Sequence, residues 1–182
     1  CPRARLPDFV KPTRFASLVA LQHRNFRLLW IGLLVSFTGS LMQNAALLWH
    51  VSLLAPPGRK GLALGLVGLS RVLPVIALSL VSGVMADAWD RKRMMLITQS
   101  VATLVAVTLA VLAFRGLSVL WPIYILGAIG GAAAAFDMPA RQALMPMLVP
   151  REHLSNAISL NTIMAQAAAV VGPAIGGLLI GV

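Results

Sequence analysis

The sequence predicts an all-α integral membrane protein, and three observations carry that prediction. Of its 182 residues, 59% are hydrophobic and only 11% are charged, and the mean hydropathy is +0.88. A soluble domain of this size could not cover so much apolar surface. The apolar residues form continuous runs of about twenty residues or more, the length that an α-helix needs to cross a bilayer. Because these runs do not alternate with polar residues, they predict helices and not the strands of a barrel.

Five transmembrane spans are expected after a basic cytoplasmic segment at residues 1–27. Within that segment, Thr13 is expected to cap a short helix on the membrane surface. The connection at 137–153 is the longest, and its apolar residues are expected to lie on the membrane surface between Pro139 and Pro150. The spans are placed at residues 28–54, 62–86, 94–114, 117–136 and 154–182.

The distribution of basic residues predicts the orientation of these spans. With the N-terminus in the cytoplasm, eleven Lys and Arg residues fall on the cytoplasmic side and three fall outside, which satisfies the positive-inside rule. The net charge of +10 is therefore attributed to topology and to contacts with anionic lipids, and no nucleic-acid partner is predicted.

The sequence offers no recognisable set of catalytic or metal-binding residues. A single cysteine, Cys1, excludes an internal disulfide and a Cys-rich metal site. The three histidines, His23, His50 and His153, are far apart in the sequence and at different predicted depths. No phosphate-binding loop is present. We therefore predict no enzyme activity, no metal site and no cofactor.

A charged hairpin joins the second and third spans. It reads Gly83-Val84-Met85-Ala86-Asp87-Ala88-Trp89-Asp90-Arg91-Lys92-Arg93, with two acids among three bases. Topology alone would explain the bases but not the carboxylates, since acids contribute little to orientation. The hairpin is therefore predicted to have a specific role.

This hairpin resembles the signature of the major facilitator superfamily at Gly83, Asp87 and 91–93, although Ala88 and Asp90 depart from it. Residues 136–144 and 172–177 are similar to two further motifs of the branch that contains the enterobactin exporter and drug-efflux proteins. Ala168 stands where the second of these motifs usually has Gly. The resemblance covers nearly all of residues 26–182.

The resemblance implies twelve helices in two six-helix halves, which rock to give alternating access. The chain would supply five helices of the first half, and it lacks an initiator Met and stops within an apolar run. We therefore interpret it as a fragment whose missing partner is the C-terminal half of the same protein.

The resemblance also implies a conformational latch at the cytoplasmic face. Gly83 is expected to let helices approach closely, and Asp87 to accept hydrogen bonds from a helix N-terminus in the missing half. Arg91 or Arg93 is expected to pair with Asp137. The latch candidates are Gly83, Asp87, Arg91, Lys92, Arg93 and Asp137. A second motif is expected to bend the fifth span where it meets the absent half, at Gly172, Pro173, Gly176 and Gly177.

Arg71 lies near the middle of the second span, where an arginine costs about 2.5–3.5 kcal/mol on insertion scales. Pro74 is expected to free the carbonyl of Ser70 as a partner. Two interpretations remain open: Arg71 faces an aqueous cavity and favours anionic substrates, or it locks the second span against the first or fourth.

Polar side chains at helical spacing form one stripe in the first span and another in the fifth. These stripes either line a cavity or form interhelical hydrogen bonds, and the sequence does not decide between the two. The cavity candidates are Ser40, Gln43, Asn44, Arg71, Thr162 and Gln166. The resemblance places the third span, with Thr98 and Gln99, outside the cavity. Gly127, Gly130 and Gly131 are predicted to be close-packing positions of the fourth span.

The sequence therefore predicts part of a secondary active transporter in the bacterial inner membrane. The branch resemblance favours export of a small amphiphilic compound, such as a siderophore or a drug, although the residues do not distinguish export from uptake. The alternative is a non-transporting membrane scaffold or remnant of such a transporter.

Overall fold

The computed structural model describes residues 16–88 and 90–180, and these residues form a bundle of helices. The described ranges contain no β-strand. Five of the helices are long and apolar enough to cross a membrane, which confirms the predicted all-α class and the five spans. In order, the elements are η1 (Ala16–Gln22), α1 (Arg24–Leu54), α2 (Lys60–Ala88), α3 (Arg91–Phe114), α4 (Trp121–Leu148), η2 (Arg151–His153) and α5 (Leu154–Ile180).

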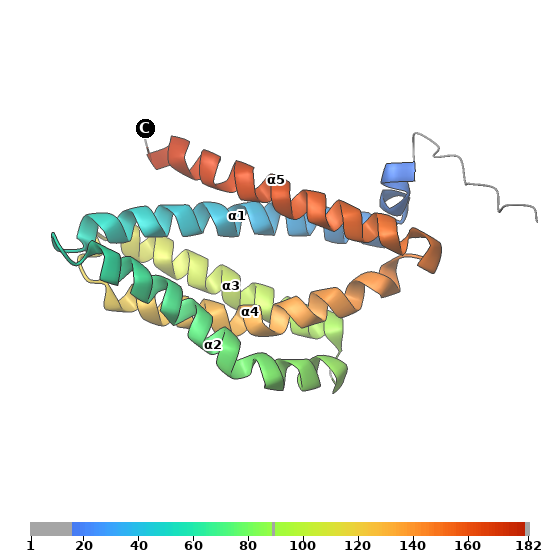
Figure 1. Ribbon diagram of the computed structural model, residues 1–182, viewed down its shortest axis with the longest axis horizontal. Helices are drawn as coiled ribbons and strands as arrows, with labels where there is room; N and C mark the ends of the chain where they lie inside the picture. The colour runs from blue at the N-terminus through green and yellow to red at the C-terminus, as the bar shows by residue number, and fades with distance from the viewer. Residues whose placement is uncertain (1–15, 89, 181–182) are drawn as a thin grey trace, which may run out of the picture.

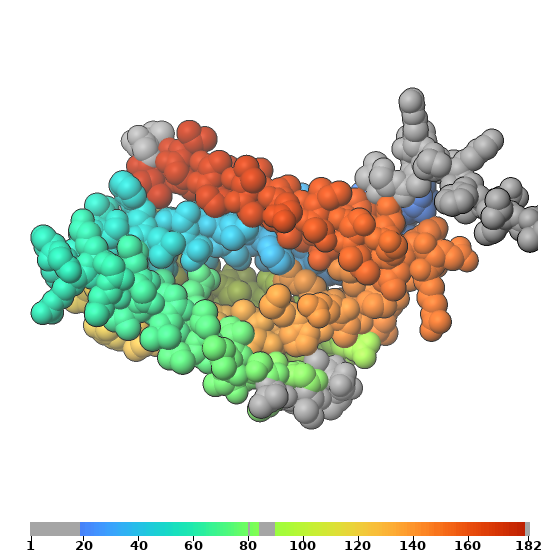
Figure 2. Space-filling view, in the orientation of Figure 1, coloured from blue at the N-terminus to red at the C-terminus, as the bar shows by residue number. Residues whose placement is uncertain are grey.

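The helices lie in two layers along one common direction (Figure 1). In one layer α1 packs on α5, and in the other α4 packs between α2 and α3. The α2–α3 hairpin and the α4–α5 connection lie at the same end of the bundle as η1, here called the η1 end. The α1–α2 and α3–α4 connections lie at the opposite end. Figure 2 shows the two layers as filled volumes with a recess between them.

Interior packing is concentrated near the two ends of the bundle. At the η1 end, Phe26 of α1 packs with Met145 of α4 and with Ala157 and Leu160 of α5. At the opposite end, Val51, Ala55, Ala63, Val67 and Ile123 form a second cluster. Large apolar side chains on all five helices are exposed. Such side chains are expected on surfaces that face lipid, because lipid chains are as apolar as the side chains themselves.

Helix α4 is longer than expected. Its predicted span ended at residue 136, with a surface segment after it, but the helix continues through Pro139 and Pro146 to Leu148. The helix continues past the predicted end of the span because tertiary packing outweighs the proline signals, and the location of residues 137–148 on the membrane surface stays a prediction. Ala140 packs against Met94 of α3, and Met145 belongs to the cluster at the η1 end. A proline inside a helix costs about 3 kcal/mol, and burial of these side chains offsets it.

Helix α3 begins inside the charged hairpin. Asp90 is its N-cap residue, and the carboxylate accepts hydrogen bonds from the backbone N–H groups of Lys92 at 2.9 Å and Arg93 at 3.4 Å. A carboxylate at this position also interacts favourably with the helix dipole. The basic triplet 91–93 therefore forms the first turn of α3 and not a loop, and one of the two hairpin acids has a structural role.

Candidate functional site

A hydrogen bond between α1 and α2 joins two of the predicted cavity residues. Nη1 of Arg71 donates to Oδ1 of Asn44 at 2.5 Å, and both residues are partly buried. The sequence suggested the Ser70 carbonyl as a partner for Arg71, but the acceptor is the Asn44 amide. The Ser70 hydroxyl donates within its own helix, to the carbonyl of Val67.

Glycines of α4 bring the backbone of α2 close at this level. A Cβ added at Gly131 would lie 2.2 Å from the carbonyl oxygen of Arg71, and one at Gly127 would lie 3.0 Å from Oγ of Ser70. The prediction of close packing is therefore confirmed at these two glycines. Gly130 makes only an ordinary contact, at 3.9 Å from Val105. The backbone of Arg71 is thus fixed against α4 while its guanidinium reaches α1.

The other cavity candidates are not gathered around this pair. Ser40 is exposed and Gln43 is half-buried on α1, and Thr162 and Gln166 are exposed on α5. The two α5 residues lie on the face away from α1, because the packed face of α5 carries Leu160, Met164 and Ala168. The Thr162 hydroxyl donates to its own helix, at the carbonyl of Ile158. Of the six candidates, the described structure joins only Arg71 and Asn44 by a hydrogen bond.

A second polar network surrounds Asp137 on α4. Its carboxylate forms an ion pair with Arg141 one turn further along the same helix. It also accepts hydrogen bonds from Oγ1 of Thr98 at 3.0 Å and Nε2 of Gln99 at 3.3 Å, both on α3. Gln99 in turn accepts from the Ser36 hydroxyl of α1 at 3.1 Å.

Arg141 closes this network onto α1. Its guanidinium lies over the ring of Phe37, 4.7 Å from the ring centroid, and the residue is 9% exposed. The network therefore holds α1, α3 and α4 together, with Arg141 buried, Asp137 half-buried and the two charges paired, although Nε and Nη1 of Arg141 have no hydrogen-bond partner among the described residues. The sequence did not indicate this role for Thr98, Gln99 or Phe37, although the spacing of Asp137 and Arg141 is typical of an ion pair on one helix.

The expected pairing of Arg91 or Arg93 with Asp137 was wrong. Arg91 donates to the carbonyl of Ala143 at 3.3 Å and to Sδ of Met147 at 3.1 Å. The exposed Arg93 lies 3.8 Å from the Asp90 carboxylate. Helices α3 and α4 are antiparallel, with Thr98 level with Asp137. Arg91, seven residues before Thr98, is therefore displaced by about 10 Å along the helices.

The remaining latch residues are Gly83, Lys92 and Asp87. A Cβ added at Gly83 would meet no described atom within 4 Å, so the expected close approach is not found within this part of the chain. Lys92 is exposed. The side chain of Asp87 lies outside the described residues, and its predicted role stays a prediction.

The glycines of the motif in α5 pack against α1. A Cβ at Gly172 would lie 2.8 Å from Cβ of Leu41 and 2.9 Å from the carbonyl of Thr38, and one at Gly176 would lie 3.3 Å from Met42. Gly177 has no described atom within 4 Å, and Pro173 lies within the helix and is exposed. Gly172 and Gly176 therefore join helices of the same half. The expected contact with an absent half stays a prediction.

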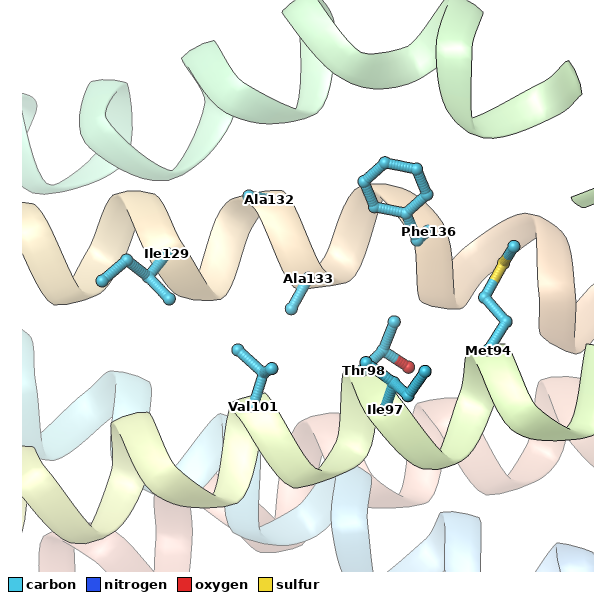
Figure 3. Close-up of a pocket in the computed structure, with 8 residues that line it drawn as sticks. All are labelled: Met94, Ile97, Thr98, Val101, Ile129, Ala132, Ala133 and Phe136. Atoms are coloured by element: carbon cyan, nitrogen blue, oxygen red, sulfur yellow. The ribbon is translucent and has the colours of Figure 1, made fainter. Parts of the chain in front are cut away.

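Two grooves lie along α3, and neither contains a cavity candidate. The first, of about 310 Å³, lies between α3 and α4 (Figure 3). Its one polar side chain, Thr98, already donates to Asp137, so the groove is suited to an apolar occupant such as a lipid chain. The second, of about 290 Å³, lies between α1 and α3 and includes Ser36 and Gln99. The first groove is lined by Met94, Ile97, Thr98, Val101, Ile129, Ala132, Ala133 and Phe136.

Two histidines that the sequence placed at different depths lie side by side. Nε2 of His23 is 3.1 Å from Nδ1 of His153 at the η1 end. The expectation failed because the chain returns to the same end of the bundle over a sequence separation of 130 residues. Within the described ranges, no group of three or more His, Cys, Asp or Glu side chains is placed to hold a metal ion.

Helices of membrane length, with buried charge between them, define a multi-pass membrane protein. The family model MFS_3, transmembrane secretion effector, matches residues 15–182. The chain belongs to this family of major facilitator superfamily transporters. No solved structure matches the chain.

Named bacterial relatives include exporters of different compounds. The chain is 32% identical to the staphyloferrin A transporter of Staphylococcus aureus over 65% of this chain and 30% of the relative. It is 27% identical to macrolide efflux protein A of Streptococcus pyogenes over 85% of this chain and 37% of the relative. It is 34% identical to the enterobactin exporter EntS of Shigella boydii over 63% of this chain and 28% of the relative. The resemblance to the enterobactin-exporter branch is thus confirmed, and the chain spans about a third of the length of these relatives.

Proposed function

We propose that this chain is part of a secondary active transporter that exports a small amphiphilic compound, of the siderophore or drug class, by alternating access. Membership of the secretion-effector family supports this proposal. So do the named relatives, which include a siderophore exporter and a macrolide efflux protein. The observation in the chain itself that carries it is the Arg71–Asn44 pair between α1 and α2.

The charge of Arg71 is the feature that supports a substrate-binding role. An ionised group in the middle of a span costs about 2.5–3.5 kcal/mol on insertion scales, so it is kept where it serves a pathway or a counter-charge. Both ion pairs of the described residues involve other bases, Arg93 and Arg141. A neutral amide partner orients the Arg71 guanidinium without neutralising it. We infer that Arg71 presents positive charge to an anionic or acceptor-rich substrate in the recess between the two layers.

We further propose that the η1 end faces the cytoplasm of a bacterium, with the chain in the plasma membrane. This end carries the basic first turn of α3 and, beside the connection to α5, Arg151, as the positive-inside rule favours. Its exposed bases would contact anionic lipid headgroups. The substrate pathway would be completed by the remaining helices of the full-length protein.

The test is transport by the full-length protein in proteoliposomes, with iron-free catecholate and carboxylate siderophores and a macrolide as substrates. We expect transport of at least one compound, a loss of about tenfold or more in Arg71→Ala, and a changed substrate preference in Arg71→Lys, because Lys lacks the bidentate geometry. Arg115→Ala, at the C-cap of α3, is the matched control and should transport normally.

Two results would overturn the proposal. If the wild-type protein binds lipid and folds but moves none of these compounds, the scaffold interpretation is favoured. If Arg71→Ala and Arg71→Lys both keep the wild-type rate and substrate range, Arg71 belongs to helix packing and not to a substrate cavity.

A further inference from the structure

Two imidazoles meet where η1, α1, η2 and α5 converge at the η1 end. His23 lies between η1 and α1, and His153 is the last residue of η2, directly before α5. Nε2 of His23 and Nδ1 of His153 are 3.1 Å apart. The ring centroids are 5.4 Å apart and the ring planes are inclined by 42°. Both side chains are half-buried, so the pair is held by the protein and still reachable from solvent.

The backbone on both sides of the pair is held by other contacts. The N–H of Ala20, which is fully buried, donates to Oδ1 of Asn156 in the first turn of α5 at 3.1 Å. The His23 N–H donates to the carbonyl of Ala20, and the His153 N–H donates to the carbonyl of Pro150. Ala20 also belongs to the apolar cluster that contains residues of α1, α4 and α5. The two rings therefore meet on a preformed support.

We propose that His23 and His153 form a two-ligand site for a divalent transition-metal ion of the Zn²⁺, Ni²⁺ or Cu²⁺ class. Zn–N distances are about 2.0–2.1 Å, so two imidazole nitrogens on one ion lie about 3.3 Å apart at a tetrahedral angle and about 2.9 Å apart at a right angle. The observed 3.1 Å falls between these values. To point at one ion, each lone pair must lie about 40° from the line that joins the two nitrogens, so the rings rotate when the ion binds, and water would complete the coordination.

Binding of the ion needs no additional proton donor or acceptor. In the hydrogen-bonded pair, one of the two facing nitrogens carries a proton and the other accepts it. Metal binding needs both facing nitrogens unprotonated, so the proton moves to the other nitrogen of the same ring, His23 Nδ1 or His153 Nε2. Two neutral imidazoles then bind the ion and no net proton is released. Arg24 and Arg151 flank the pair but are exposed, so water and salt screen their repulsion of the ion.

A bound ion would cross-link η1 and the start of α1 to the α4–α5 connection. The hydrogen bonds of this region would then open less often, because the ion adds a restraint that exists only in the folded arrangement. This consequence is measurable without a transport assay and does not depend on the proposed function.

The test uses the full-length protein in lipid nanodiscs, purified without a polyhistidine tag and titrated calorimetrically with ZnCl2, NiCl2 and CuCl2. We expect one ion per chain, tightest for Cu²⁺, and slower amide hydrogen exchange in residues 16–22 when the ion is bound. Removing an outer partner of a metal ligand already costs 10–100-fold in affinity. Loss of a direct ligand in His23→Ala or His153→Ala should therefore weaken binding by about tenfold or more.

Two further variants separate metal binding from a merely structural hydrogen bond. His153→Asn keeps a hydrogen-bonding side chain, so it should retain the fold and lose the ion. His50→Ala is the matched control, since His50 lies about 40 Å along α1 from His23, and it should bind as wild type. The proposal is overturned if the wild-type protein binds no ion, or if His153→Asn binds the ion as tightly as wild type. It is equally overturned if adding the ion leaves exchange in residues 16–22 unchanged.

Discussion

Replacing Gly131 with alanine tests whether the contact between α2 and α4 fixes the position of Arg71. The added Cβ would lie 2.2 Å from the carbonyl oxygen of Arg71, 3.0 Å from its carbonyl carbon and 3.1 Å from its Cα. Ordinary C···O contacts are about 3.3 Å or longer. Because all three atoms belong to the backbone of α2, no side-chain rotation relieves the overlap, and the two helices must separate by about 1 Å.

The size of the effect follows from two opposing terms. Overpacking a close-packed site costs about 1–3 kcal/mol, and a contact with helix backbone lies in the upper part of that range. Alanine returns up to about 1 kcal/mol through its higher helix propensity. We therefore expect Gly131→Ala to lower the free energy of unfolding by about 2 kcal/mol. For a chain of 182 residues that would correspond to a fall in Tm of about 4–8 °C, and the longer full-length protein should show a fall of about 2 °C.

The assay is thermal unfolding of the full-length protein in one detergent, followed by circular dichroism, with Gly130→Ala as the matched control. The adjacent Gly130 has Val105 Cγ1 at 3.9 Å as its nearest neighbour, which is ordinary van der Waals contact. Its substitution should leave Tm unchanged or raise it slightly. An equal Tm for Gly131→Ala and Gly130→Ala would refute the close approach of α2 and α4 and, with it, the anchoring of Arg71.

Three further outcomes follow from contacts described above. Asp137→Asn leaves the buried Arg141 guanidinium without its counter-charge and should destabilise by about 3–5 kcal/mol. A double variant with Arg141→Met should unfold at a higher temperature than Asp137→Asn alone, and a lower one would contradict the ion-pair account. Asp90→Ala should cost about 1 kcal/mol by loss of the N-cap, and Asp90→Asn should restore it in the same thermal assay. Gly172→Ala should lower Tm by pushing α5 from α1, whereas Gly177→Ala, with no described neighbour within 4 Å, should not; similar effects would argue against that packing.

The helices were predictable because membrane spans are encoded locally. Each apolar run had to satisfy its own backbone within lipid, so hydropathy and length sufficed to place five spans. The end of α4 was not predictable in this way. Pro139 and Pro146 are local signals against a helix, and the burial that overrides them involves residues of α1, α3 and α5. When tertiary packing determines where a helix ends, the hydropathy of that segment does not reveal the end.

Local sequence patterns could not predict which side chains pair between helices. Arg91 and Asp137 were matched by sign and by membrane face, but the antiparallel register of α3 and α4 places Arg91 beside Ala143. The same limit hid the meeting of His23 and His153 across 130 residues. Close packing was predicted correctly at Gly127 and Gly131 of α4 but not at Gly130, because small residues at helical spacing indicate close approach whichever helix is the partner.

The two arginines inside the bundle differ in how their charge is compensated, and this difference separates structure from function. Arg141 has a carboxylate on its own helix and an aromatic ring beneath its guanidinium, so its charge is paired within the fold. Arg71 has a neutral amide on a helix of the other layer, so the contact orients the guanidinium while its charge stays available. Since burying an uncompensated charge is costly, the fold tolerates Arg71 most easily beside water or an anion. We propose that the recess between the two layers meets this requirement, and for this reason Arg71, and not the more buried Arg141, carries the proposed function.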